Sequence, residues 1–297
     1  MNISDSQIGS IPHRSDLDYR AFVNDYLKTR RPVIFDDALD EWEAVRKWTP
    51  QLFAERYGAL ALVIDGRSIT MANLVSLILN ADRRDPAPYL RNHPIASISR
   101  DLLRDIEPLP AYLRPNWLET KFYPAKVNQI LGRAVIPDIF IGGTSSSFPF
   151  LHYDLLNSHA FLCQVYGEKA YAMYSPDQTP LLYRSTEHPN RSQICNIASP
   201  DLKKFPLFSG ARPIRGVLKP GEMIFIPAGW WHTAKILSPS ITVSINVANW
   251  SNWWGLVKDQ YRNATKSPTL LHRLAAAPLA AYLAGVGAYR AVVPLRK

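Results

Sequence analysis

The 297-residue sequence is poor in the residues that specify cross-linked or repetitive proteins. It has only two cysteines, Cys163 and Cys195, which excludes a disulfide framework and a four-thiolate zinc site and favours a reducing compartment. Its 14 glycines follow no period, which excludes a collagen-like chain. Because 47% of the residues are hydrophobic, a wholly disordered chain is excluded as well. The length and composition suit one large globular core.

Long apolar runs are also scarce. The first 20 residues are polar and predict no secretory signal, so we expect a cytoplasmic protein. The longest apolar stretch, residues 274–289, contains Pro278 and two glycines. It is shorter than the roughly 20 residues that a membrane-spanning helix needs. We therefore expect a packed or dimer-forming helix there and no membrane span.

Acidic residues are nearly missing from the last third of the chain. Residues 205–297 contain 11 basic residues but only Glu222 and Asp259 as acids, whereas residues 1–204 contain 23 of each sign. The simpler interpretation is a basic tail that aids solubility. The alternative is a surface that faces a polyanion such as RNA, or an acidic protein.

The first half of the sequence predicts helices and a few strands. Hydrophobic spacing and caps predict helices over residues 16–27, 48–57 and 70–82 and short buried strands over residues 32–35 and 59–65. Ser15 is the expected cap of the first helix. Prolines and charges alternate from there to about residue 135, which indicates irregular structure around short helices.

The second half changes to strands. Five short segments rich in aromatic and β-branched residues are separated by glycine or proline: IPDIFIGG, HAFLCQVY, GEKAYAMY, GEMIFIPA and SITVSINVAN. This pattern predicts a β-sandwich or barrel. Residues 250–297 then predict helices that are broken near Ser267-Pro268 and at Pro278.

A metal-binding pattern stands out in this strand-rich half. In extended backbone His152 and Asp154 point to the same side, and His232 follows the later segment GEMIFIPAGWW. Two histidines and one carboxylate on one face of a metal are typical of non-haem Fe(II) oxygenases. On the HYD triplet alone, an ordinary surface or core histidine is the simpler interpretation.

Two strands strengthen the metal hypothesis. Alternation places Lys169 and Tyr171 on one face of the GEKAYAMY strand, where a lysine inside a barrel would need an anion. In ITVSINVAN, the polar residues Thr242, Ser244 and Asn246 share one face, which suits a barrel that holds a polar ligand. The alternatives are an edge-strand lysine and a sheet surface that faces solvent.

The segments HYD, GEKAYAMYSP and PGEMIFIPAGWWH, in this order and spacing, resemble the cupin-like JmjC (jumonji C) Fe(II)/2-oxoglutarate oxygenases. With the upstream RRPVIFDDALDEWEAVRKWTPQLFAERYG, the resemblance covers roughly residues 18–255 and is closest to the small protein and RNA hydroxylases. It implies a mainly β fold with flanking helices, a double-stranded β-helix (jelly-roll) barrel. The implied organisation is an oxygenase domain over residues 1–255, with its barrel core at about 137–250, and a basic helical region over residues 256–297.

The resemblance also assigns roles to particular residues. It makes His152, Asp154 and His232 the iron ligands. It assigns the distal carboxylate of 2-oxoglutarate to Lys169, with Ser244 assisting and Tyr89 reaching the same co-substrate. It places Asn246 beside the metal ligands.

Two positions depart from the pattern of the resembled family. Pro149 stands where members often have Thr or Ser, three residues before the first ligand. Leu162 stands where several have Asn, eight residues after the acid. We therefore expect a different lining around the keto-acid, with His159 or Gln164 contributing.

The implied activity is hydroxylation of a protein or peptide side chain, or of a tRNA base. Such an enzyme uses Fe(II), O2 and 2-oxoglutarate and releases succinate and CO2. Three alternatives stay open: an N-methyl demethylase of the same family, a metal cupin that does not use the keto-acid, and a non-catalytic cupin. The resemblance further implies a homodimer formed by C-terminal helices, with residues 269–290 as the candidate segment.

Overall fold

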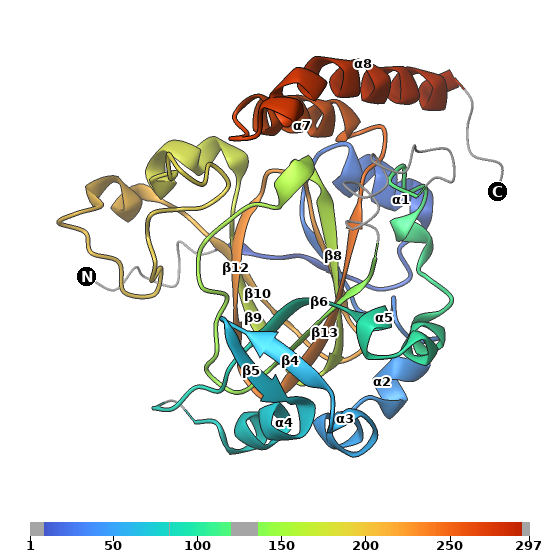
Figure 1. The fold of residues 1–297 in the computed structure, drawn as a ribbon, viewed down its shortest axis with the longest axis vertical. Helices are drawn as coiled ribbons and strands as arrows, with labels where there is room; N and C mark the ends of the chain where they lie inside the picture. Colours follow the sequence, from blue (N-terminus) through green and yellow to red (C-terminus); the bar gives the residue numbers. More distant parts are fainter. Residues whose placement is uncertain (1–8, 83, 120–135, 293–297) are drawn as a thin grey trace.

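The computed structural model describes residues 9–82, 84–119 and 136–292. Its centre is a barrel made from a four-stranded and a seven-stranded sheet, with helices packed around the outside (Figure 1). A small two-stranded sheet lies beside the barrel. This mainly β jelly-roll with flanking helices is the predicted fold.

The smaller sheet forms one side of the barrel wall. Its order is β1 (Gly9–Ser10), β10 (Ile214–Leu218), β9 (Lys169–Tyr174) and β12 (Trp231–Ile236). Strand β9 runs antiparallel to both β10 and β12, and His232 lies opposite Met173 in this ladder. The sequence analysis identified β9 as a strand but not β10 or β12.

The larger sheet forms the rest of the wall. Its order is β2 (His13–Arg14), β3 (Val33–Phe35), β11 (Met223–Ile226), β8 (His159–Tyr166), β13 (Ser240–Val247), β7 (Asp138–Gly142) and β6 (Leu90–Pro94). Central strand β13 pairs antiparallel with β8 and β7, so that Ser244 lies between Leu162 and Asp138. Strand β6 lies in the region that was expected to be irregular.

The outer elements are mostly short. The helices are α1 (Tyr19–Phe22), which continues as the π-helix η2 (Val23–Leu27), α2 (Glu43–Lys47), α3 (Pro50–Tyr57), α4 (Met71–Asn80), α5 (Ile95–Ile98), α7 (Trp253–Thr265) and α8 (Leu270–Val292). The 3-10 helices are η3 (Arg100–Ile106), η4 (Ala111–Leu113), η6 (Leu155–Asn157), η7 (Pro176–Leu182) and η8 (Pro206–Gly210). Strands β4 (Ala61–Ile64) and β5 (Arg67–Thr70) form the hairpin beside α4.

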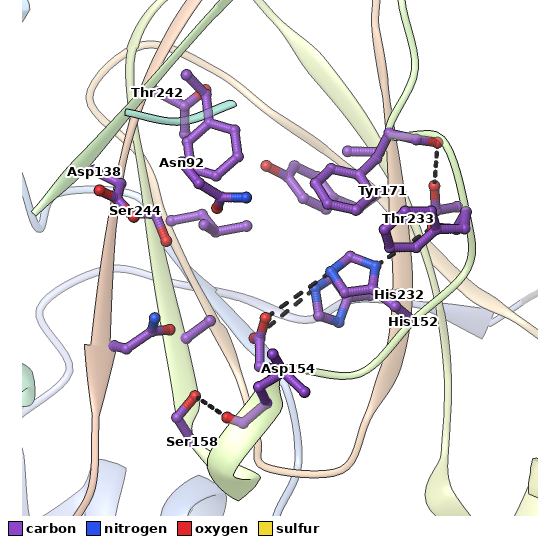
Figure 2. A pocket seen from close by; sticks show the side chains of 18 of the residues that line it. Asn92, Asp138, His152, Asp154, Ser158, Tyr171, His232, Thr233, Thr242 and Ser244 are labelled. Atoms are coloured by element: carbon purple, nitrogen blue, oxygen red, sulfur yellow. Dashed lines mark hydrogen bonds and ion pairs between the residues drawn. The ribbon is translucent and has the colours of Figure 1, made fainter. Parts of the chain in front are cut away.

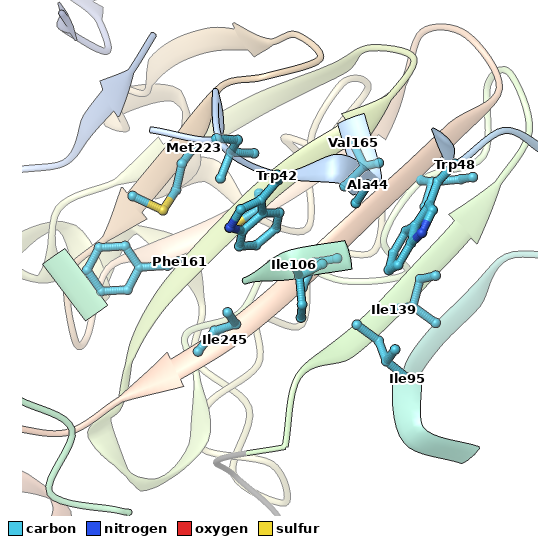
Figure 3. Close-up of a cluster of buried hydrophobic side chains, with 14 of the residues drawn as sticks. Trp42, Ala44, Trp48, Ile95, Ile106, Ile139, Phe161, Val165, Met223 and Ile245 are labelled. Carbon is cyan, nitrogen blue, oxygen red and sulfur yellow. The ribbon is translucent and has the colours of Figure 1, made fainter. Parts of the chain in front are cut away.

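The main hydrophobic core lies on the outer face of the larger sheet, under the N-terminal helices (Figure 3). Two tryptophans from the helical layer, Trp42 and Trp48, are fully buried there. The sheet contributes alternate residues of β13, including Val243 and Ile245. The other face of β13 is thereby left to the polar residues, as the alternation predicted.

Two predictions at the N-terminal side were wrong in detail. The cap of α1 is Asp18, which accepts a hydrogen bond from the Ala21 N–H, and not Ser15. The hydroxyl of Ser15 instead donates to Asp36. Strand β4 is only half-buried, because it pairs with β5 alone and leaves Val63 73% exposed.

The C-terminal helix is longer than predicted. Helix α8 continues through Pro278, which was expected to break it, and reaches 23 residues. Pro278 is exposed, so its ring lies away from the contact between α8 and α7. By length and composition alone, α8 could cross a membrane, and 17% of its most apolar window is buried.

Candidate metal and co-substrate site

The two candidate histidine ligands are held against each other by their backbones. The His152 N–H donates to the His232 carbonyl at 3.1 Å, and the His232 N–H donates to the His152 carbonyl at 2.6 Å. This pairing brings the two imidazole centroids to 4.4 Å. Each Nδ1 faces a backbone carbonyl, at 3.4 Å for His152 and 3.0 Å for His232, so both Nε2 atoms face the cavity.

Asp154, two residues after His152, completes the group. Its two carboxylate oxygens lie 3.9 Å from the Nε2 atoms of His152 and His232, and the three ligand atoms are within 4.8 Å of one another. Burial raises the pKa of Asp154. Burial, and then the proximity of His232, lower the pKa of His152 well below its usual value. The neutral imidazole of His152 thus offers a lone pair, and the donor set suits a divalent metal with open positions.

The three ligands line a cavity of about 420 Å³ between the two sheets (Figure 2). Figure 2 shows His152, His232 and Asp154 on one side of it and Asn92, Asp138 and Ser244 on the other. Residues from β8, β9, β12 and β13 all contribute to the lining. The cavity is therefore the interior of the barrel itself.

Lys169 lies in the same cavity and is only 2% exposed. Its ammonium donates to the Tyr89 hydroxyl at 2.9 Å and lies 5.5 Å from the Phe140 ring centroid. No carboxylate of the described residues lies within ion-pair distance of it. Burial lowers the pKa of Lys169 to about 7. A buried amine with this environment is suited to pair with an anion that enters the cavity.

The other predicted site residues also reach this cavity. Tyr89, Ser244 and Asn246 line it, together with Leu162 at the position where Asn was expected. Burial raises the pKa of Tyr89, so its hydroxyl stays protonated and can donate to an incoming carboxylate. The structure therefore brings into one space all seven residues to which the resemblance assigned a role.

His159 and Gln164 do not line the cavity, contrary to expectation. His159 lies on the core face of β8, where Nδ1 accepts from the Ala228 N–H at 2.9 Å and Nε2 is 2.8 Å from the Ser251 hydroxyl. Burial lowers the pKa of His159 to about 3. Gln164 shares the face of Leu162 but lies beyond the cavity, where its amide binds the Tyr166 and Gly167 carbonyls.

Several residues that line the cavity were not predicted from the sequence. Asn92, Asp138, Phe148, Phe150 and Thr233 all face the cavity. Asn92 has a positive φ of 49° at an irregularity in the pairing of β6 and β7. Such bulges re-aim side chains, but no sequence pattern marked this one.

Residues 19–254 match the family described as Cupin-like domain. The chain belongs to this family. Within it, the chain is similar to JmjC proteins: it is 28% identical to Lysine-specific demethylase JMJ21 of Arabidopsis thaliana over 82% of its length, and 28% identical to Lysine-specific demethylase 8 of Xenopus tropicalis over 78%. These matches cover only 26% and 50% of the two relatives.

A third relative is named for RNA chemistry. The cupin-like chain is 27% identical to tRNA wybutosine-synthesizing protein 5 of Danio rerio, over 79% of its own length and 74% of the relative. The likeness to named enzymes supports an enzyme of the JmjC type. Two of these relatives are named as lysine-specific demethylases and the third for tRNA modification.

Proposed function

We propose that this protein is an Fe(II)- and 2-oxoglutarate-dependent dioxygenase that hydroxylates a protein or peptide side chain, or a tRNA base. The observation that carries the proposal is Lys169, a buried cation in the cavity that also holds the His-Asp-His group. On the β9–β12 ladder, Lys169 is four residues from Met173, which lies opposite His232. That is roughly 13 Å of strand, which leaves room for a short dicarboxylate between the metal and the lysine side chain.

The chain's own residues would bind and orient the reactants. His152, Asp154 and His232 would hold Fe(II), since their donors already converge and each Nδ1 is fixed by a carbonyl. Bound iron and keto-acid together supply the oxidant from O2 that converts a C–H to C–OH, with succinate and CO2 as products. Lys169 and the Tyr89 hydroxyl would grip the distal carboxylate through charge-assisted hydrogen bonds, with Ser244 nearby.

Aromatic side chains protect the ligand side of the cavity. Phe148 stacks on His152 at 4.3 Å between centroids with an interplanar angle of 13°. Phe150 meets the same imidazole edge-on, at 5.4 Å and 83°. These rings fix the imidazole orientation and keep bulk water away from one side of the metal position.

Two other activities use parts of the same site. An N-methyl demethylase would apply the same oxidant to a methyl carbon, and two relatives are named lysine-specific demethylases. A cupin that does not use the keto-acid would need only the metal ligands. The buried Lys169 favours the keto-acid enzymes, because a site without that anion would leave this amine unpaired.

Succinate formation from 2-oxoglutarate tests the proposal. Wild type with Fe(II) should form succinate slowly even without substrate, and His152→Ala should form none. Lys169→Ala should raise the KM for 2-oxoglutarate about 30-fold or more, because it removes one partner of a buried charged contact. Lys235→Ala is the matched control, since this exposed lysine lies on the adjacent strand, opposite Ala170.

A titration separates a failed assay from a failed proposal. If wild type makes no succinate, calorimetry with Mn(II) and 2-oxoglutarate shows whether the keto-acid binds. Binding that Lys169→Ala weakens would keep the proposal and indicate a tightly coupled enzyme. No binding by wild type would overturn it in favour of a keto-acid-independent cupin.

We also propose that the protein is a homodimer that pairs through α8. The buried side of this helix packs on α7 through Leu283 and Gly287. Its other side leaves large apolar residues exposed, among them Leu271, Leu274 and Tyr289 at 62–68%. A helix face with several exposed large apolar side chains is typical of an interface.

A further inference from the structure

Arg191 is fixed directly beside the first metal ligand. The Ser192 N–H donates to the Leu151 carbonyl at 2.8 Å, and the Tyr153 N–H donates to the Asn190 carbonyl at 3.0 Å. These bonds pair Arg191 with His152 across an antiparallel bridge. Residues directly opposite in such a pair project to the same face. Arg191 therefore lines the same cavity as His152.

The guanidinium of Arg191 has no acidic partner among the described residues. Its central carbon lies 4.1 Å from the Phe150 ring centroid, so one face is stacked on the ring. Its Nε is buried and makes no hydrogen bond to any residue that the structure describes. A buried donor left without an acceptor costs free energy, and native proteins rarely retain one without a reason. The geometry calls for an acceptor that arrives from outside, and an anion suits a guanidinium best.

A second cavity of about 190 Å³ adjoins the first and continues the positive charge. Leu155 and Asn190 line both cavities. The second cavity carries three cations, Arg184, Arg262 and Lys266, and two acids, Glu187 and Asp259. Of the acids, Asp259 is already met by Arg262 at 3.5 Å.

Arg184 lines the second cavity and is held in place there. Its guanidinium lies 5.8 Å from the Tyr153 ring centroid and donates to the Tyr153 hydroxyl at 2.9 Å. Tyr153 stands between the ligands His152 and Asp154 in the sequence. Cations therefore line both spaces, Arg191 in the inner cavity and Arg184 in the outer one.

We propose that these two cavities bind single-stranded RNA, with Arg191, Arg184, Arg262 and Lys266 on successive backbone phosphates and one base in the inner cavity. The inner cavity offers what an extruded base needs, namely aromatic rings at Phe148 and Phe150 and amides at Asn190 and Asn246. Two of the four cations, Arg262 and Lys266, belong to the last third of the chain, where basic residues outnumber acidic ones by 11 to 2. A glutamate-rich peptide would pair with the cations but has no ring to stack on Phe148 or Phe150. This inference rests on the proposed hydroxylase function for its reaction, but not for its binding.

Binding without turnover tests the inference. Full-length protein loaded with Mn(II) and 2-oxoglutarate is titrated with a labelled single-stranded RNA of about 12 nucleotides, followed by fluorescence anisotropy at several salt concentrations. Arg191→Gln should weaken RNA binding about tenfold. The double variant R184Q/K266Q should weaken RNA binding by a similar total factor, because each of its two substitutions removes a smaller contribution to the affinity. The double variant should also flatten the slope of log K against log salt by about 1.4, or about 0.7 for each phosphate contact.

The control and the competing ligand make the result decisive. Arg104→Gln removes an arginine with an 84% exposed side chain on η3, outside both cavities, and should leave affinity and slope unchanged. Arg191→Lys keeps the charge but loses the stacked fork, so it should restore only part of the affinity. Equal affinity of wild type and the double variant for RNA would overturn the inference, as would tighter binding of a glutamate-rich peptide. Because succinate formation is not measured, failure of the hydroxylase proposal would show separately.

Discussion

At the scale of the residue, Lys169 is the side chain whose environment most constrains the chemistry. Burial lowers its pKa to about 7, well below the value in an unfolded chain. Burial of the charged amine therefore lowers the free energy of unfolding, by the full amount below about pH 7. The loss shrinks as the pH rises from about 7 towards the pKa of lysine in the unfolded chain. A bound carboxylate has the opposite effect, since it favours the ammonium and raises the pKa of the lysine.

This opposition predicts that 2-oxoglutarate binding takes up a proton above neutral pH. As the pH rises above about 7, the Kd of the Mn(II)-loaded protein for 2-oxoglutarate should rise by up to about tenfold per pH unit. Calorimetry in two buffers with different ionisation enthalpies measures the proton directly. Lys235→Ala should behave as wild type. A pH-independent Kd with no proton uptake would show that Lys169 is not the carboxylate partner.

The same scale shows which site residues a sequence can reveal. Strand alternation predicted that Lys169 faces the barrel interior, whereas the resemblance to the JmjC oxygenases was needed to assign His152 and Asp154 as ligands. The pairing of Arg191 with His152 could not be predicted, because it is a bridge between segments that show no strand pattern. Asn92 faces the cavity through a positive φ, a backbone property that its residue type only permits.

At the scale of the element, the close approach of β7 to its neighbours positions the co-substrate residues. A Cβ on Gly142 would lie 2.5 Å from Ile236 Cδ1 and 2.7 Å from Tyr89 Cδ2. Tyr89 and Ile236 pack with Phe140 in one apolar cluster, and the Tyr89 hydroxyl accepts from Lys169. Glycine at position 142 therefore lets the Tyr89 ring pack closely against β7.

Gly142→Ala should displace Tyr89 and weaken 2-oxoglutarate binding several-fold. Overpacking at such a site costs about 1–3 kcal/mol of unfolding free energy, so the Tm should also fall by a few degrees. Thermal unfolding and the KM for 2-oxoglutarate measure the two effects. Gly210→Ala is the control, because its added methyl would meet only Leu181 Cδ1, at 3.9 Å, and Gly210 lies outside the cavity. An unchanged KM would mean that the Tyr89 position does not matter for the keto-acid.

Strand prediction succeeded where residues alternate and failed where pairing alone creates the strand. Strands β8, β9, β11 and β13 carry the apolar or alternating patterns that predicted them. Strand β10 has Gly216 at its centre, where a Cβ would lie 3.1 Å from Ile11 and 3.2 Å from Ile34, and glycine weakens the strand pattern. Strand β12 begins directly after a turn and mixes polar and apolar residues, so only its ladder with β9 defines it.

At the scale of the whole molecule, the C-terminal helices extend the barrel with a second, separate cluster. Trp253 and Leu283 are buried there against Trp117, and Trp253 donates to the Leu283 carbonyl at 2.9 Å. Gly287 allows the close approach, since a Cβ on it would lie 2.4 Å from the Trp253 ring. The inner face of α8 is thus committed to this chain, and only its outer face is available for another.

The outer face of α8 predicts the assembly state. In sedimentation velocity the wild type should be a dimer, and L271E/L274E should be a monomer, because four carboxylates would meet across a two-fold interface. Leu207→Glu is the control, since this 55% exposed residue lies on η8, away from α8. A monomeric wild type would contradict the proposed dimer. The substitutions lie on the exposed side of α8, so they should not destabilise the protomer itself. A double variant that still unfolds cooperatively, with little change in Tm, has lost pairing and not folding.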